Sequence, residues 1–452
     1  MAAIILCRQR VLLLFATAVI LLFANSVHAQ SEPEQKTFNI EKLSPYNGRR
    51  ISQIEFTGLR WTRNSAARDL LSLHEGDIFE ASRWLIGIHK IYDTTVLYDI
   101  ETVAAADPDD SAKIRLTVEV QDRWTLLPFA VVQSGGGSSS FGVGVVEFNF
   151  LGTFAQVSGS YGTFDGIDSF DLNVFQEFFR DTDLIWGIDL SQIGTPTQLQ
   201  LNDGSTAGTF TRLRSQLQLL VGRKWAESKI RFLTYIEIIH DQLTGTQSGF
   251  SVGVSPGNQY RLRPTLIFGR SELTNFLEQG EELTFAPVVA NVFDRTASYA
   301  QFVMTYKKVI LHGNTNYALF LNSGAMTTAE VPYLFRLGGY DTNRGFATNR
   351  AIGRLYATSS LEFRPYFFRF ETELSGQVVV QGCVFQDSGV MWSANQFSRG
   401  SPQSDRLPLL SEGFGLRANF LRFSGAIVRI DAAKSVSPDE GWDISLGIGQ
   451  FF

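Results

Sequence analysis

The chain has 452 residues, a formal net charge of −6 and a mean hydropathy close to zero. This acidic balance argues against nucleic acid as a partner. The composition combines 37 phenylalanines with 40 glycines, which is unusual for a soluble domain and typical of a membrane β-barrel with aromatic girdles and small lumen residues.

The first 29 residues have the order of a secretory signal peptide. Arg8 and Arg10 precede an unbroken apolar run, Val11–Phe23, and small residues follow at Val27–Ala29. A retained membrane anchor is the alternative, but a spanning helix needs about 20 apolar residues. Cleavage at residue 29 removes two arginines and leaves Cys383 as the one cysteine, which excludes an intramolecular disulfide.

Residues 30–49 are polar and are expected to form a flexible leader. A compact α/β unit follows at 50–123, because short alternating segments flank two segments with helical spacing. The pattern predicts strands at 51–56, 96–103 and 114–120, and helices at 63–73 and 80–92. This β-α-α-β-β unit resembles a POTRA domain, the periplasmic module of outer-membrane assembly proteins. The matching segments are IEFTG, EGDIF and IRLTVEVQDRW.

From residue 124 to 452 the helical pattern disappears and alternation takes over. In Asp183–Leu190, for example, Leu184, Trp186 and Ile188 share one face opposite Gly187 and Asp189. Such dyads between turn residues are typical of transmembrane strands. Roughly 20 residues per strand and connection give about 16 strands. A soluble β-sandwich or propeller is the alternative. The SGGGSSS segment at 134–140 is expected to be a flexible loop, since it lacks the ending of a phosphate-binding loop.

Three motifs follow one another in the last third: LGGYDTNRGF at 337–346, SLEFR at 360–364 and FQDSG at 385–389. On these motifs the chain resembles the BamA/TamA superfamily, which includes the two-partner secretion transporters. EFNFLGT at 147–153, GFGLR at 413–417 and VRIDAA at 428–433 extend the resemblance. It implies a sixth extracellular loop with an Arg-Gly-Phe/Tyr motif and a later strand with Phe-x-Asp-x-Gly.

Alternation also predicts which side chains face the lumen. Gln377, Gln381 and Asp387 share one face of their strand, opposite Val378, Val380 and Val384. By the same parity Glu362 and Arg364 face inward, opposite Leu361 and Phe363.

A loop folded into the lumen would place Arg344 against Asp387 and Glu362, as a guanidinium can bind a carboxylate with two hydrogen bonds. Gly345 would allow a tight turn, Phe346 would pack on the inner wall, and Gly389 completes the strand motif. The alternative leaves Arg344 on a solvated loop tip.

The end of the chain also alternates. Trp442, Ile444, Leu446 and Ile448 occupy one face of the expected last strand, and the chain ends on Phe452. A terminal aromatic strand is similar to the targeting signal of outer-membrane barrels, although Gln450 stands where a hydrophobic residue is usual.

Catalysis, metals and cofactors are not expected. Ser251 lies in a Gly-x-Ser-x-Gly pattern, but Ser255-Pro256-Gly257 follows at once and precludes the helix that a nucleophile elbow needs. The histidines have no metal-ligand spacing. His89 is expected to be structural, and Asp431 to belong to the last hairpin rather than to act as an acid catalyst.

The resemblance implies a protein of the bacterial outer membrane whose POTRA-like domain lies in the periplasm. Its expected partners are membrane lipid, unfolded or partly folded polypeptides that add a strand to the POTRA edge, and periplasmic accessory proteins. The predicted function is insertion or translocation of polypeptides. The alternative is a passive solute channel or a structural barrel.

Overall fold

A computed structural model describes the chain from residue 40 onward with internal gaps. The described residues are 40–135, 138–180, 182–200, 204–225, 229–247, 257–274, 277–292, 298–327, 331–339, 341–372, 376–392, 406–420 and 427–448. The predicted signal peptide 1–29, most of the predicted leader, the Ser251 pattern, Gln450 and Phe452 lie outside the described residues.

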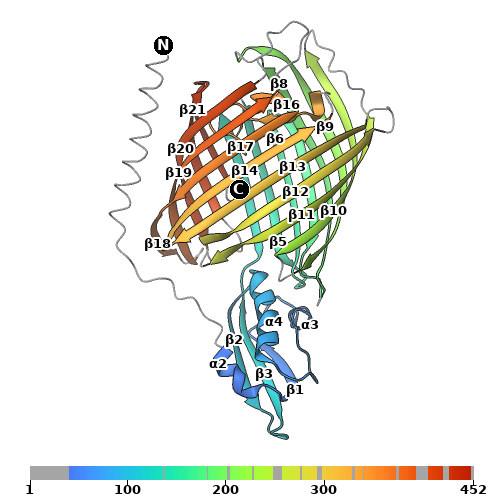
Figure 1. Cartoon of the computed structure of the whole chain (residues 1–452), viewed down its shortest axis with the longest axis vertical. Helices are drawn as coiled ribbons and strands as arrows, with labels where there is room; N and C mark the ends of the chain where they lie inside the picture. The colour runs from blue at the N-terminus through green and yellow to red at the C-terminus, as the bar shows by residue number, and fades with distance from the viewer. Residues whose placement is uncertain are drawn as a thin grey trace. The chain divides into compact units, whose positions relative to one another are not determined.

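A small α/β domain comes first (Figure 1). Its elements are α2 (Ile40–Leu43), η1 (Ser44–Tyr46), β1 (Arg50–Thr57), α3 (Asn64–Asp69), α4 (Ala81–Asp93), β2 (Leu97–Ala106) and β3 (Lys113–Asp122). The sheet order is β1-β3-β2, with β1 parallel and β2 antiparallel to the central strand β3. The expectation of a flexible leader at 30–49 is wrong at 40–46, because α2 and η1 form there and Leu43 is buried in the domain core. From β1 onward the β-α-α-β-β order is the one predicted from the sequence. In the part of the chain that the structure describes, no helix is long and apolar enough to cross a bilayer.

The first helix of this domain is shorter than predicted. Helix α3 ends at Asp69, whereas the apolar spacing predicted a helix to residue 73. Leu70, Leu71 and Leu73 are all buried although they lie beyond the end of α3. The chain instead crosses α4 at Gly87, where a Cβ atom would lie 2.7 Å from the backbone nitrogen of Ser72. Close packing therefore overrides the helical pattern.

The domain has an apolar core between the helices and the sheet. Trp84, Ile88 and Ile91 of α4 are at most 1% exposed and share one cluster with Ile114 and Val118 of β3. This packing explains the alternation along β3. Its even-numbered residues, such as Ile114 and Val118, face the helices, and its odd-numbered residues face away from them.

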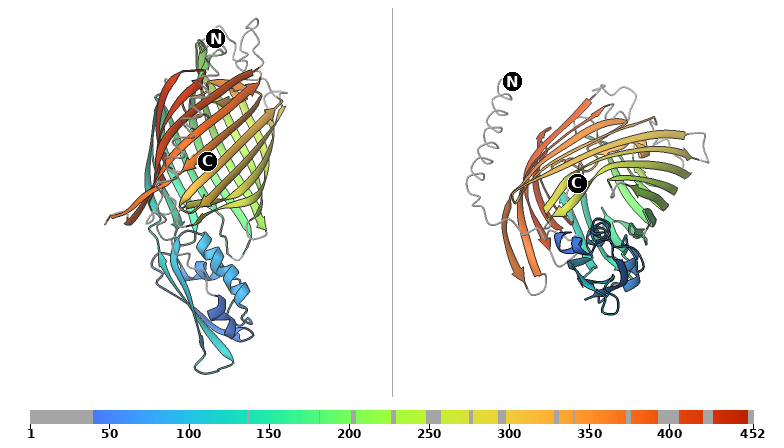
Figure 2. Two further views of the ribbon diagram at one scale, coloured as in Figure 1. Left: turned by 60° about the vertical axis from the view of Figure 1, so that its left-hand side comes forward. Right: turned by 60° about the horizontal axis from the view of Figure 1, so that its bottom comes forward.

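The remaining strands form one closed barrel (Figures 1 and 2). Its strands are β4 (Leu126–Gly135), β5 (Ser138–Phe150), β6 (Ala155–Phe164), β7 (Ile167–Gln176), β8 (Leu184–Gln200), β9 (Thr206–Trp225), β10 (Ile230–Gln247), β11 (Gly257–Thr274), β12 (Leu277–Val292), β13 (Ser298–His312), β14 (Thr315–Met326), β17 (Leu355–Arg364), β18 (Tyr366–Thr372), β19 (Gly376–Trp392), β20 (Arg406–Phe420), β21 (Ile427–Ser437) and β22 (Gly441–Ile448). A single closed sheet excludes the sandwich and the propeller.

The barrel comprises 17 strand segments among the described residues. Two of them, β17 and β18, pair with successive parts of β19 and are separated by Pro365, which has no N–H to donate. They act as one interrupted strand, which leaves 16 spans. An even number is required because every neighbouring pair is antiparallel, and it agrees with the count predicted from the length.

The apolar residues of the predicted alternating pattern in β8 face outward, as expected. Leu184, Ile188 and Leu190 point away from the lumen and are 38%, 45% and 47% exposed. The expectation of a flexible loop at 134–140 is wrong, because β4 and β5 extend into it. Gln133 pairs with Ser140 and Ser134 with Ser139. Ladder pairs therefore extend to Gly135 and Ser138 despite the glycine and serine composition of this segment.

Candidate functional site

The connection between β14 and β17 turns back into the barrel. It contains η2 (Val331–Tyr333) and a short hairpin of β15 (Phe335–Leu337) and β16 (Ala351–Gly353). We call residues 327–354 the lumen loop. Arg344 and Phe346 in this loop are each 1% exposed. The structure thus contradicts the alternative of a solvated loop tip at Arg344.

Arg344 forms a two-pronged contact with Asp387 of β19. Its Nε donates to Oδ2 and its Nη2 to Oδ1, each at 2.8 Å, and its backbone N–H donates to the same Oδ2 at 3.2 Å. Both side chains are at most 1% exposed. The parallel N–H groups of a guanidinium match two carboxylate oxygens, which an ammonium cannot do. Asp387 therefore fixes both the side chain and the main chain of the loop at this residue.

The other edge of the guanidinium faces β17 and β21. Nη1 of Arg344 forms an ion pair with Oε1 of Glu362 at 2.7 Å and lies 3.6 Å from Oδ2 of Asp431. Nη2 donates to Oγ of Ser360 at 3.2 Å, and this hydroxyl donates to Oδ1 of Asp387 at 2.6 Å. One loop residue thus contacts three strands of the wall.

An aromatic ring lies under the same guanidinium. The Cζ atom of Arg344 is 3.5 Å from the ring centroid of Phe385, which is two residues before Asp387 and therefore on the same face of β19. A desolvated cation–π contact contributes about 2 kcal/mol. The first residue of the FQDSG motif thus packs on the arginine of the loop motif.

Further arginines neutralise the carboxylates. Arg364 donates to Glu362 at 2.6 Å, Arg417 donates to Asp431 at 2.7 Å, and Arg429 lies 3.7 Å from Asp431. We call the whole group the lumen ion cluster. Its members are Arg344, Arg364, Arg417, Arg429, Glu362, Asp387 and Asp431, each with a side chain at most 5% exposed. Charges so deeply buried are tolerated because each has an opposite charge beside it.

Gly345 and Phe346 complete the loop motif. Gly345 has a φ of +85°, and a Cβ atom there would lie 3.0 Å from the backbone of Lys434 and Ser435 on β21. Phe346 packs in an apolar cluster with Tyr356 and Met391 of the wall. The glycine lets the loop approach the wall closely, and the phenylalanine fills the space beyond it.

Gly389 acts by its lack of a side chain. A Cβ atom at this position would lie 2.7 Å from Oδ1 of Asn343. Asn343 is 0% exposed and directly precedes Arg344. The glycine of the strand motif therefore makes room for the loop residue beside the arginine.

The lumen loop also contacts strands β8, β9 and β13. Nη1 of Arg336 donates to Oγ1 of Thr197 on β8 at 2.9 Å, and Tyr333 stacks on Tyr299 of β13 with ring centroids 5.5 Å apart. Ile352 packs with Phe210 of β9. Together with the lumen ion cluster, these contacts carry the loop across the barrel interior.

The last strand has its predicted orientation where its side chains are described. Trp442 and Ile444 are 61% and 62% exposed, whereas Asp443 and Ser445 are 7% and 5% exposed. Leu446 and Ile448 belong to β22, but their side chains lie outside the described residues.

Sequence reasoning missed several members of the site. Phe385, Ser360 and Arg417 received no role, and Asp431 was assigned to the hairpin alone. The alternation of the strands could have indicated two of them. Phe385 is two residues before Asp387 and so shares its face, and Asp431 follows Ile430, which is 48% exposed and so lies on the other face. Among the described residues, no group of three or more His, Cys, Asp or Glu side chains could hold a metal ion.

No family model and no curated protein matches the sequence. The fold does match solved structures. BamA from Haemophilus ducreyi, in a form lacking POTRA domains 1–3, is 15% identical, with 88% of this chain and 84% of that chain covered and a TM-score of 0.58. CdiB from Acinetobacter baumannii is 13% identical, with 88% and 73% covered and a TM-score of 0.61. CdiB from Escherichia coli is 12% identical, with 89% and 76% covered and a TM-score of 0.62.

These identities show a shared fold. The chain has the barrel fold of BamA and CdiB, and the resemblance predicted from its motifs is confirmed at that level.

Proposed function

We propose that this chain is an outer-membrane protein of the BamA/TamA type that assists the insertion or translocation of polypeptides at the bacterial outer membrane. Residues 50–123 act as a POTRA-like domain in the periplasm. The partners are membrane lipid, unfolded or partly folded polypeptides and periplasmic accessory proteins. The shared fold with BamA and CdiB supports the protein class.

The observation that carries the proposal is the seam where the barrel closes. Strands β22 and β4 share two residue pairs, Ile444 with Ser134 and Ser445 with Gln133, in the part of the chain that the structure describes. By contrast Leu446, Gly447 and Ile448 of β22 pair with β21 but, within the described residues, not with β4. Strand groups without ladder partners can accept an incoming strand. The seam therefore offers a place where a polypeptide can enter the sheet.

The lumen loop favours this proposal over a passive channel. It crosses the barrel interior from the lumen ion cluster to Thr197 of β8 on the opposite wall. A pore for solutes requires an open path, which a loop anchored at both walls obstructs. The seam does not depend on such a path.

A disulfide across the seam tests the function. Ser134→Cys with Ile444→Cys joins residues that face each other in the register, and paired Cβ atoms in a sheet lie close enough for a bridge after a small shift. Oxidation is expected to abolish activity, measured as the amount of folded barrel proteins in the outer membrane, and a reductant should restore it. Native Cys383 can stay, because it is 2% exposed.

The matched control keeps one of the two cysteines. Ala432→Cys with Ile444→Cys joins the same residue to its partner on β21, so it adds a bridge without locking the seam and should leave activity intact. Full activity of the oxidised seam variant would contradict the proposal. So would recovery of the protein outside the outer-membrane fraction.

A further inference from the structure

The sheet of the α/β domain has two edges, and they differ. Strand β3 is central, so β1 and β2 each have one side away from it. Exposed strand edges pair readily with other extended chains unless something covers them. The difference between the two edges therefore decides where an extended polypeptide can dock.

The first half of the β1 edge is covered by backbone. The N–H of Ile51 donates to the carbonyl of Asp77 at 2.9 Å, and the carbonyl of Ile51 accepts from the N–H of Gly76 at 2.8 Å. The N–H of Phe79 donates to the carbonyl of Arg49 at 2.8 Å. The segment 76–79 thus occupies the place of a neighbouring strand up to Ile51.

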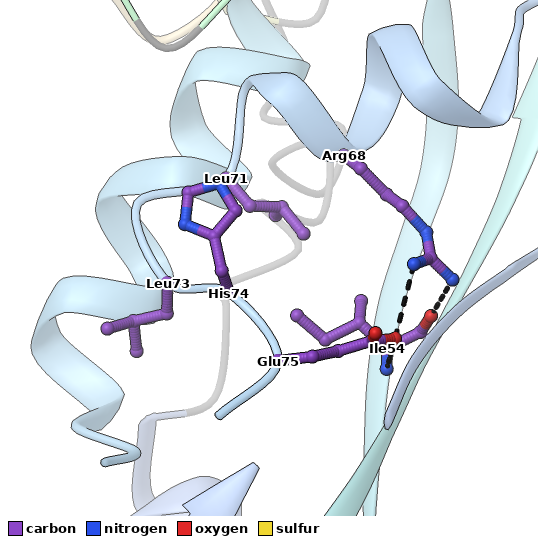
Figure 3. A pocket seen from close by; sticks show the side chains of 6 residues that line it. All are labelled: Ile54, Arg68, Leu71, Leu73, His74 and Glu75. Atoms are coloured by element: carbon purple, nitrogen blue, oxygen red, sulfur yellow. Dashed lines mark hydrogen bonds and ion pairs between the residues drawn. The ribbon is translucent and has the colours of Figure 1, made fainter. Parts of the chain in front are cut away.

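Two charged side chains continue this cover where the backbone segment ends (Figure 3). The N–H of Ile54 donates to Oε1 of Glu75 at 2.9 Å, and the carbonyl of Ile54 accepts from Nη2 of Arg68. Nη1 of Arg68 lies 3.1 Å from the same carboxylate oxygen, and its Nε donates to Oδ1 of Asn64 at 2.8 Å. The N–H and the carbonyl of Ile54 are therefore hydrogen-bonded to Glu75 and Arg68, as they would be to a neighbouring strand.

The pair stands beside a hollow that suits a side chain. A cavity of about 270 Å³ is lined by Ile54, Arg68, Leu71, Leu73, His74 and Glu75. Arg68 and Glu75 are 38% and 43% exposed, so this ion pair is weak and contributes little to the fold. A strand hydrogen-bonded to Ile54 could place an apolar side chain against Leu71 and Leu73, but only after the pair has moved.

The β2 edge differs from the β1 edge. Among the described residues, β2 pairs with β3 and with no other strand. Val103 in this strand is 46% exposed.

We propose that Arg68 and Glu75 are edge caps that close β1 to incoming strands and so restrict polypeptide docking to the β2 edge. This inference rests on the proposed function, since it assumes that extended polypeptides bind the domain. It assigns edge choice to two surface residues that do not touch the lumen ion cluster or the seam.

Photo-crosslinking on the purified full chain tests the caps. Benzoylphenylalanine replaces either the exposed Glu55 on β1 or Val103 on β2, and the probe is a fluorescent peptide with the sequence of β22, residues 441–448. With native caps, adducts are expected at position 103 and only weakly at position 55. Glu75→Ala should raise the yield at position 55 about fivefold, the change that one net hydrogen bond supplies, and leave position 103 unchanged.

Two further variants keep the result interpretable. Glu75→Gln retains an oxygen that accepts from Ile54 and should keep the edge closed, and Glu119→Ala removes an exposed carboxylate from the central strand and should change nothing. An unchanged yield at position 55 in Glu75→Ala, or equal yields at both edges with native caps, would overturn the inference. Absence of adducts at position 103 would instead remove the docking step of the proposed function.

Discussion

The α/β domain and the barrel lumen both exclude water from their centres, but with opposite kinds of side chain. Trp84 and its neighbours in the domain form a cluster of aliphatic and aromatic groups. The lumen ion cluster holds four guanidinium groups, that of Arg344 included, and three carboxylates, with the ring of Phe385 beside Arg344. Both regions are equally buried, so burial alone does not tell which interactions hold a region together.

The difference teaches how each region responds to a deletion. Removing part of an apolar core costs the transfer free energy of the lost atoms and leaves a cavity. Removing one member of a buried ion cluster leaves its partner charged in a medium of low dielectric. The first loss depends on size, and the second on whether the partner remains.

Trp84→Ala should unfold the α/β domain, and its effect should be confined to that domain. Trp84 is 0% exposed and its indole N–H donates to Thr102 at 3.1 Å, so the loss is about 3–5 kcal/mol. A domain of this size has little stability to spare. Limited proteolysis should then cut residues 50–122 while the barrel keeps its heat-modifiable migration. Trp61→Ala, at a tryptophan that is 45% exposed, serves as control. Equal protease resistance in both variants would refute the apolar-core interpretation.

Arg344→Ala should destabilise the barrel by about 3–5 kcal/mol, because Asp387 is left buried without its main partner. A double-mutant cycle with Asp387→Ala, followed by unfolding in detergent, should give a coupling of about 1–3 kcal/mol. Arg344→Lys should recover only part of it, since an ammonium lacks the two-pronged geometry.

The control for this cycle is Arg223 and Asp183, which lie 4.0 Å apart with side chains 63% and 41% exposed. Their coupling should stay below about 1 kcal/mol. Additive effects at Arg344 and Asp387 would show that the lumen pair contributes no more than a surface pair.

Gly345→Ala should cost about 1–3 kcal/mol, because the backbone is in the left-handed region and the new Cβ atom presses on β21. Gly166 has a similar φ of +80°, and a Cβ atom added there would have no other atom within 4 Å. Gly166→Ala therefore measures the strain alone. The difference between the two unfolding free energies isolates the close approach of the loop, and equal losses would mean that the approach is immaterial.

The smallest effect concerns Asp107, a carboxylate of the α/β domain that is 9% exposed. Hydrogen bonds from Ser52 and from the N–H of Asp109, together with Arg115, lower the pKa of Asp107 to about 2. Because the folded pKa lies below the unfolded value of 3.8, this stabilisation is present above about pH 4 and is lost as the pH falls towards 2. Asp107→Asn should therefore reduce the loss of stability between about pH 4 and pH 2, measured as urea unfolding monitored by proteolysis. Asp109→Asn, at a carboxylate 92% exposed, should keep it; identical curves would contradict the assignment.

Much of the fold could be predicted from local patterns. Alternation predicted the β-α-α-β-β order and the barrel, and the inward direction of Glu362 and Asp387. Prediction from local patterns failed where contacts between residues distant in the sequence determine the local structure. Helix α3 ends early because Leu70, Leu71 and Leu73 must all be buried against α4. Ser134 and Gly135 form strand rather than loop because they pair with Ser139 and Ser138.

The site divides in the same way. The motifs of the sequence pointed to Arg344 and its first two carboxylates, and parity alone determined which wall residues face the lumen. Which lumen residues meet was decided by the tertiary structure, because Phe385, Asp431 and Arg417 reach Arg344 or its partners only when distant strands close into one barrel. A local period of two residues gives the direction of a side chain. Its partners depend on the shear and closure of the whole sheet, which no local pattern encodes.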